Sequence, residues 1–206
     1  LPLHGVMPLS QTLDSPGPIA KTILDCLIMF DVLDGREGWQ ITRDMEKFDG
    51  TYAMLNKGVS GLRLGSLNES ERQQCSDDVL ASYDMALDRL RLMGAEIITF
   101  ENPVSYGDMA DDNGMITAVE AFHNHGYLYK NPDLPMDEDV RARMLLGGRY
   151  HAHDYFGVLQ QRKETMQAFG DCMRGFDALV MPSSTSTAPI VTEVDQAVSP
   201  GHFTRP

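Results

Sequence analysis

The feature that most constrains the fold is a short strand, a capped helix and a second strand that follow one another in the first half of the chain. Residues 61–65 alternate between apolar and polar positions, as strands do. Ser70 and Gln73 form a capping-box pattern, and we expect a helix that begins there and ends at Gly94. Residues 95–100 (AEIITF) predict the second strand. Two strands joined by one helix pair in parallel, so we predict an α/β protein that contains a parallel βαβ unit.

Helical patterns dominate the remainder of the chain. We expect a helix from Pro18 to about Asp34, because apolar residues recur there at helical spacing. Further helices are predicted over residues 116–129, from 135 to an interruption at Gly147 and Gly148, and over 155–174. Residues 176–181 predict a buried strand, and the polar residues 36–61 predict a surface connection.

Composition limits the partners that the chain can have. Its 206 residues suffice for one domain or part of a larger one, and 42% of them are hydrophobic. The formal net charge of −13 argues against direct contact with nucleic acid. No apolar run approaches the roughly 20 residues of a membrane span, so we expect no membrane partner. Three widely spaced cysteines fit a reducing, cytoplasmic location better than a disulfide framework.

Six blocks, in order along the chain, resemble the amidase signature family of amide hydrolases. The best of them runs from Leu13 to Asp25 with the sequence LDSPGPIAKTILD. The others are residues 61–65, residues 86–97, the pair Glu120-Ala121, residues 140–147 with Asp154, Tyr155 and Arg162 behind them, and residues 176–182. Together they cover almost the whole chain.

The resemblance implies a mixed β-sheet flanked by helices and a Ser–cis-Ser–Lys mechanism without cofactor or metal. In that family the nucleophile, its lysine and a Gly/Ser-rich loop precede the segment that resembles residues 13–25. No run of the Gly-Gly-Ser-Ser-Gly-Gly type occurs in this sequence. We therefore expect residues 1–206 to be a single partial amidase domain, truncated at both ends and inactive alone, and we assign no catalytic residue within it.

Two residues are candidates for substrate binding. Arg143 matches the arginine of the 140–147 block, and the resemblance implies that it can hold a substrate carboxylate as a bidentate pair. His123 follows the Glu120-Ala121 pair, which resembles a helix near the acyl site. The alternatives are a surface salt bridge for Arg143 and a surface or packing role for His123. The two His-x-His pairs, 123–125 and 151–153, do not have the spacing of a helical metal site.

Four polar residues of the best-matching block are expected to have structural roles. Ser10 and Ser15 have no obvious base nearby, so we predict capping or structural hydrogen bonds for them. Asp14 and Asp25 are expected to accept hydrogen bonds from backbone or helix-terminal N–H groups. The loop 182–189, rich in serine and threonine, can line the mouth of a pocket or simply connect two elements.

The sequence leaves more than one function open. The first is hydrolysis of a small amide to a carboxylate and ammonia or an amine, by residues outside this chain. The alternatives are a non-catalytic split subunit that completes a site carried on another chain, and the A subunit of a tRNA-dependent amidotransferase. A homodimer, or association with the missing part of the fold, is left open by the sequence.

Overall fold

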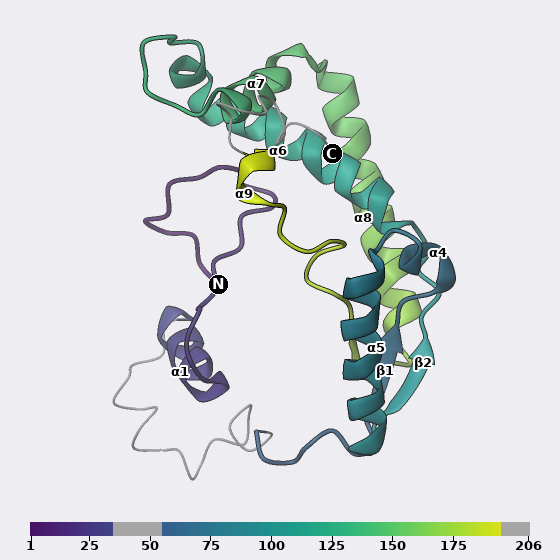
Figure 1. The fold of residues 1–206 in the computed structure, drawn as a ribbon. Coiled ribbons are helices and arrows are strands. Elements are labelled where there is room, and N and C mark those ends of the chain that lie inside the picture. Colours follow the sequence, from purple (N-terminus) through teal and green to yellow (C-terminus); the bar gives the residue numbers. More distant parts are fainter. Residues whose placement is uncertain (35–54, 195–206) are drawn as a thin grey trace.

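The computed structural model describes residues 1–34 and 55–194. Figure 1 shows a small sheet with helices beside it, and two long helices that run from this sheet to a cluster of helices farther away. The predicted surface connection over 36–61 falls largely outside the described residues, and its described end, residues 55–61, is a series of mostly exposed turns.

Three parallel strands form the sheet, in the order β2-β1-β3. They are β1 (Arg63–Ser66), β2 (Glu96–Thr99) and β3 (Ala178–Leu179). Leu64 in the central strand pairs with Ile97 on one side and with Ala178 on the other. The α/β class and the parallel pairing of the first two strands are confirmed.

Helices make up most of the described chain. They are α1 (Ile23–Leu33), α4 (Glu69–Arg72), α5 (Asp77–Leu92), α6 (Tyr106–Tyr129), α7 (Glu138–Leu146), the 3₁₀ turn η1 (Gly147–Arg149), α8 (Ala152–Met173) and α9 (Val191–Val194).

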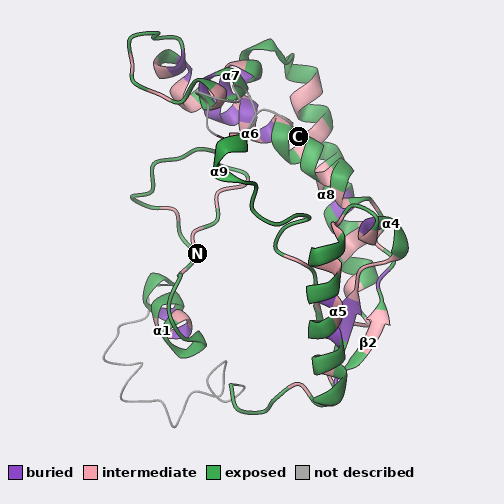
Figure 2. Ribbon diagram, in the orientation of Figure 1, coloured by how far each residue is buried: buried purple, intermediate pink, exposed green. Residues whose placement is uncertain are grey.

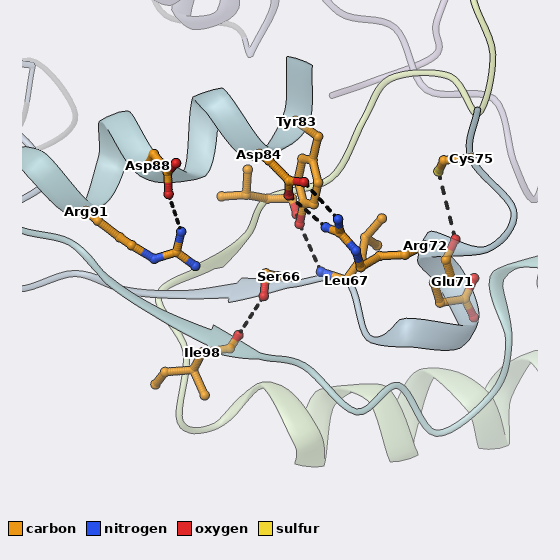
Figure 3. Close-up of polar contacts among 11 residues, drawn as sticks. Ser66, Leu67, Glu71, Arg72, Cys75, Tyr83, Asp84, Asp88, Arg91 and Ile98 are labelled. Atoms are coloured by element: carbon orange, nitrogen blue, oxygen red, sulfur yellow. Dashed lines mark hydrogen bonds and ion pairs between the residues drawn. The ribbon is translucent and has the colours of Figure 1, made fainter. Parts of the chain in front are cut away.

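The sheet is packed between α5 and the end of α8 (Figure 3). On the α5 side Tyr83 and Leu87 are buried, as their helical spacing predicts. On the other side the ring of Phe100 lies 5.3 Å from the rings of Phe169 in α8 and Phe176 before β3. Aromatic pairs at this distance add to the burial of apolar surface, so these contacts hold the helices on the sheet.

Polar contacts join the ends of the strands. The Tyr83 hydroxyl accepts a hydrogen bond from the Leu67 N–H (2.9 Å) and donates one to the Val180 carbonyl (2.8 Å), so it links the segments that follow β1 and β3. Arg72 of α4 donates two hydrogen bonds of 2.9 Å to Asp84 of α5, and this pairing lowers the pKa of the Asp84 carboxyl (Figure 3). The short α4 is thereby fixed against α5.

The second packed region is the helical cluster of α6, α7 and η1 (Figure 2). Ile116 and Ala121 of α6 are fully buried there. The backbone of Gly147 packs so closely on α6 that a side chain at this position would overlap the Ala118 carbonyl group. The predicted interruption at Gly147 and Gly148 is confirmed as η1. A glycine is needed because the two backbones meet there.

The first helix begins later than predicted. We expected it to open at Pro18, but α1 begins at Ile23. The Thr22 hydroxyl accepts a hydrogen bond from the Asp25 N–H (3.1 Å) and caps the helix. The Asp25 carboxylate in turn accepts from the Thr22 hydroxyl (2.8 Å) rather than from a backbone N–H.

The prediction of a capping box at Ser70 was wrong. The Asn68 side chain caps α4 and accepts from the Glu71 N–H (3.0 Å), and this helix ends at Arg72. A second helix, α5, then begins after Ser76. Asn and Ser are comparably good caps, and Asn68 also receives support from outside the helix, because its amide donates to the Asn102 side chain (2.7 Å).

Two further boundaries differ from the predicted ones. The strand expected over 176–181 is reduced to the two residues of β3, and Ala178 in it is exposed. The helix expected from residue 116 begins at Tyr106, because the Ser105 hydroxyl caps it by accepting from the Asp108 N–H (3.0 Å). The other predicted helices are present, each with its start displaced by a few residues.

Candidate functional site

A buried carboxylate joins three distant parts of the chain. Glu120, in the middle of α6, accepts hydrogen bonds from the hydroxyls of Ser10 (2.5 Å), Thr12 (2.5 Å) and Tyr155 (2.6 Å). It also accepts one from the Thr12 N–H (3.0 Å). The four donors come from the segment 8–14 and from α8, so this single side chain fixes both of them to α6.

The segment 8–14 is itself closed into a turn that presents these donors. The Asp14 N–H donates to the Ser10 carbonyl (2.9 Å), and the Leu13 N–H donates to the Ser10 hydroxyl (3.1 Å). The Asp14 carboxylate accepts from the Leu9 N–H (2.9 Å), which confirms its predicted role. Ser15 donates to the Leu13 carbonyl (3.3 Å). Both serines make structural hydrogen bonds, as expected.

Electrostatics fix the protonation state of this cluster. Burial by itself raises the pKa of the Glu120 carboxyl, but the hydrogen bonds from Ser10, Thr12 and Tyr155 outweigh it and bring the pKa below its ordinary value. Burial and the neighbouring Glu120 both raise the pKa of the Tyr155 hydroxyl. Near neutral pH the carboxylate is therefore ionised and the phenol is protonated. Such a group serves as an anchor rather than as a proton donor.

The next turn of α6 fastens the same segment. Gln11 donates to the Asn124 side chain (2.6 Å), whose amide donates to the Leu9 carbonyl (3.2 Å). The His125 ring lies 2.6 Å from the Pro8 carbonyl oxygen. Of the pair at 123–125, it is therefore His125 that contacts another segment. Sequence reasoning did not single it out, and nothing in the spacing of the pair marks it.

A hollow of about 660 Å³ lies where β1 and β3 end. Its walls come from the segments that follow these strands and from the start of α6. They include Leu67, Glu71, Tyr106, Asp108 and residues 181–185. The carboxyl ends of parallel strands are where α/β proteins commonly bind ligands. The first part of the predicted loop 182–189 therefore lines this hollow.

Glu71 holds the wall of this hollow in place. Its side chain accepts from the Asn102 amide (2.8 Å) and from the Tyr106 N–H (3.1 Å). The lining segment 181–185 is tied to the chain after α4, because the Ser76 N–H donates to the Thr185 carbonyl (2.8 Å). The arrangement offers hydroxyls, carboxylates and an apolar surface around one opening, which suits a small polar ligand.

The two predicted substrate-binding residues lie on different helices. His123 is on α6 and Arg143 is exposed on α7, and neither of them lines the hollow at the strand ends. The buried arginine of the 140–147 block is Arg141. It donates to the carbonyls of Tyr129 (3.0 Å) and Asn131 (2.6 Å), among others, and so closes the connection from α6 to α7.

The described residues contain neither a metal-binding cluster nor a membrane-spanning helix. In the described parts of the chain, no cluster of three or more His, Cys, Asp and Glu side chains could hold a metal ion. The rings of His151 and His153 stack 5.7 Å apart. No helix within residues 1–34 or 55–194 combines the length and the apolar composition that a membrane crossing requires.

Comparison with known proteins assigns the family. The sequence pattern of the amidase family matches residues 1–204. The chain belongs to the amidase family. An amidase from Pseudomonas putida is 28% identical over 180 residues, which are 87% of this chain and 38% of that protein. The A subunit of a glutamyl-tRNA(Gln) amidotransferase from Salinispora tropica is 30% identical over 222 residues, with 90% of this chain and 44% of that protein covered.

A solved amidase structure shares the fold. The chain superposes on a crystal structure of an amidase with a TM-score of 0.76 at 20% identity, over 93% of this chain and 40% of that one. A second neighbour, from a vestigial protein complex related to an s-triazine catabolic enzyme, gives a TM-score of 0.59 over 68% of this chain. This amidase chain thus spans about two fifths of the length of the curated relatives it matches.

Proposed function

We propose that this chain forms part of an enzyme that hydrolyses the C–N bond of a small amide to a carboxylate and ammonia or an amine. The observation that carries the proposal is the match to the amidase family over residues 1–204. The 28% identical amidase of Pseudomonas putida supports the same reaction class. The cytoplasm is the proposed location, since Cys26, Cys75 and Cys172 are free thiols.

The proposed chemistry uses a Ser–cis-Ser–Lys set that lies outside this chain. The nucleophilic serine attacks the carbonyl carbon while its proton passes through the second serine to the lysine. Backbone N–H groups stabilise the oxyanion, and the leaving amine takes the proton as the C–N bond breaks. Water then hydrolyses the acyl-serine ester to the carboxylate. The contribution of this chain is scaffold and substrate binding.

The decisive experiment compares the chain alone with the whole protein isolated from its native cells. Ammonia release is measured with a panel of simple aliphatic, aromatic and amino-acid amides. We expect turnover by the whole protein and none by residues 1–206. Release by the 206 residues that survives repurification would show that the chemistry lies on this chain. Failure of the whole protein on the entire panel would count against the amidase reaction.

Within the proposed enzyme, Arg143 is the candidate that holds a substrate carboxylate. Replacing it by glutamine is expected to raise the KM for amides that carry a carboxylate by about tenfold, with little change for neutral amides, because a charge-assisted pair is lost. Arg149→Gln, at an exposed arginine of η1, is the matched control. The KM values of the His123→Gln variant are measured in the same assay. An equal change in KM for both substrate classes on going from wild type to the Arg143 variant, or no change for either class, would refute the assignment.

The second candidate function is that of an amidotransferase A subunit, which the 30% identical relative from Salinispora tropica favours. The charge of −13 disfavours direct binding of tRNA, so a partner subunit would supply that contact. Glutamine-dependent amidation of mischarged tRNA, tested with the partner subunits present, separates this function from hydrolysis of simple amides. A split subunit is recognised by its copurification with a chain that bears the Gly/Ser-rich segment.

A further inference from the structure

The helix α5 carries a short, self-complementary row of side chains on the side that faces away from the sheet. Met85 and Leu92 are almost two full turns apart, so they lie in line on the same side of the helix. Asp88 and Arg89 lie between them on that side. We call these four residues the α5 stripe. The buried residues of α5 lie on the opposite side.

The α5 stripe is exposed although half of it is apolar. Met85 is 67% exposed and Leu92 is 89% exposed. Figure 2 shows α5 exposed along much of its length. Together with Met93, the residues of the stripe line a shallow groove of about 560 Å³. Burial of its two large apolar side chains would be favourable, so the groove suits a partner that covers them.

The charges of the stripe restrict the chemistry of that partner. One carboxylate oxygen of Asp88 accepts from the Arg91 guanidinium (2.7 Å). Within the part of the chain that the structure describes, Arg89 has no carboxylate at ion-pair distance. A purely apolar surface would leave its guanidinium without an acceptor. The partner must therefore offer a carboxylate to Arg89 as well as apolar atoms to Met85 and Leu92.

A second copy of the same helix meets both requirements. In an antiparallel pair whose twofold axis passes between Asp88 and Arg89, these two residues are equally far from the axis. Asp88 of each copy then faces Arg89 of the other. Met85 faces Leu92 of the other copy for the same reason. Each apolar side chain of the stripe thus meets an apolar one, and each charge meets its opposite.

Other arrangements of two α5 helices match less well. An axis at Met85 places Leu92 opposite Asp78, and an axis at Leu92 leaves Asp88 and Arg89 facing positions beyond the end of the other helix. A parallel pair brings like charges together and aligns the two helix dipoles. The order of residues in the stripe therefore favours a single register.

We propose that the α5 stripe is a homodimer surface, on which α5 of a second copy of this chain packs antiparallel about a twofold axis between Asp88 and Arg89. Two helices about 24 Å long bury less than the roughly 800 Å² per partner of a standard interface. We therefore expect weak association, with a dissociation constant of about 10–100 μM. The proposal concerns assembly and does not depend on the proposed amide hydrolysis.

Charge reversal tests the identity of the partner. Arg89→Glu and Asp88→Arg are made singly in the whole protein that carries this chain, and sedimentation velocity measures association over a range of concentrations. Each variant alone brings like charges together on both sides of the axis, so we expect the dimer to weaken by about tenfold. An equal mixture of the two variants restores both opposite-charge contacts and should dimerise about as well as wild type. Lys163→Glu, exposed on α8, is the control with the same change of charge as Arg89→Glu.

Disulfide formation tests the register. Met85→Cys and Leu92→Cys are made singly in a background in which all other cysteines are alanine. Mild oxidation of an equal mixture should link the two variants, because positions 85 and 92 face each other. Either variant alone should link to itself far more slowly, since the two like positions are then about 10 Å apart along the helix axis, too far for a disulfide.

Several outcomes would overturn the proposal. The first is a wild-type protein that stays monomeric up to about 1 mM, well above the expected dissociation constant. The second is a dimer that Arg89→Glu weakens no more than Lys163→Glu does, or that the mixture fails to restore. The third is a disulfide that forms as fast in one variant alone as in the mixture, because it indicates another register or another surface. Recovery in the mixture also shows that both charge variants are folded.

Discussion

At the scale of single residues, Glu120 connects parts of the chain that the sequence keeps far apart. Ser10 and Thr12 precede it by more than a hundred positions, and Tyr155 follows it by 35. The Glu120 carboxylate is buried, so without these donors it would lose the hydrogen bonds that water provides. The hydroxyls in turn would lose their acceptor. Pairing the two avoids the free-energy cost of leaving either without a hydrogen bond. The cluster is therefore stable as a set and sensitive to the loss of its one acceptor.

Replacing Glu120 by alanine should lower the free energy of unfolding by about 2–4 kcal/mol, because several hydrogen bonds to a charged acceptor are lost and the buried Ser10 hydroxyl is left unsatisfied. Urea denaturation of the chain measures it. Tyr155→Phe removes one donor and should cost about 1 kcal/mol. Glu164→Ala is the control, because Glu164 is exposed on α8 and bonds only to Gln160 of the same helix in the described structure. A Glu120→Ala variant as stable as this control would contradict the anchoring role.

The same carboxylate predicts a pH dependence. The folded pKa of Glu120 lies below its ordinary value of 4.5, so its stabilising contribution is fully present above that pH and is lost as the pH falls through the folded pKa. The stability difference between wild type and Glu120→Gln should thus be constant from about pH 7 to 5 and shrink toward about pH 3. Urea midpoints across this range measure it. A difference that grows on acidification would mean that the folded pKa is raised.

Sequence reasoning recovered the character of these residues but not their partners. The structural roles of Ser10 and Ser15 were predicted from the lack of a nearby base, and that of Asp14 from the tendency of aspartate to bond nearby backbone N–H groups, and the hydrogen bonds agree. Their link to Glu120 was not predicted, since no local pattern encodes a contact across more than a hundred residues. Arg141 and Arg143 stand two apart on one helix, and only burial distinguishes the structural arginine from the exposed one.

At the scale of elements, the contact between η1 and α6 depends on a glycine, Gly147, which has no side chain. A methyl group at Gly147 would overlap the backbone carbonyl of Ala118, which has no freedom to move aside. Gly147→Ala should therefore destabilise the chain by about 2–3 kcal/mol through overpacking. Gly157→Ala in α8 is the matched control, because a methyl group there meets open space, and it should stabilise by about 0.5–1 kcal/mol. Thermal unfolding of both variants measures this contrast, and equal shifts would argue against tight packing at Gly147.

The elements were predictable where the signal is local. The βαβ unit follows from alternation, helical periodicity and Gly94, whose positive φ of 94° ends α5 as expected. The element boundaries were less predictable, because several residues near each boundary can cap a helix. Asn68 was preferred over Ser70 through a contact to Asn102, which lies beyond the second strand. Strand β3 is short because only Ala178 and Leu179 pair with β1. The sequence of 176–181 does not show where this pairing ends.

At the scale of the whole molecule, the chain has two packed regions and an apolar helix that neither of them covers. The sheet with α5 and the cluster of α6, α7 and η1 bury their own residues. Large apolar side chains also remain exposed, among them Ile19, Leu92 of α5 and Val191. Single exposed apolar residues are normal, but a helix such as α1, on which Ile23, Met29, Phe30, Val32 and Leu33 are all exposed, favours association. In residues 1–206 studied alone, we therefore expect the cooperativity of unfolding to be reduced while the secondary structure is kept.

We accordingly expect the isolated 206 residues to bind a dye such as ANS, to associate as concentration rises, and to unfold over a broad temperature range. The physical reason is that α1, whose apolar side chains are mostly exposed, adds little packing to the rest of the chain, so the chain does not melt as one unit. Calorimetry and hydrogen exchange measure this, and the amides of α1 should exchange well before those of α6. A single sharp transition of the isolated chain, with calorimetric and van't Hoff enthalpies equal, would show instead that these residues form a self-sufficient domain.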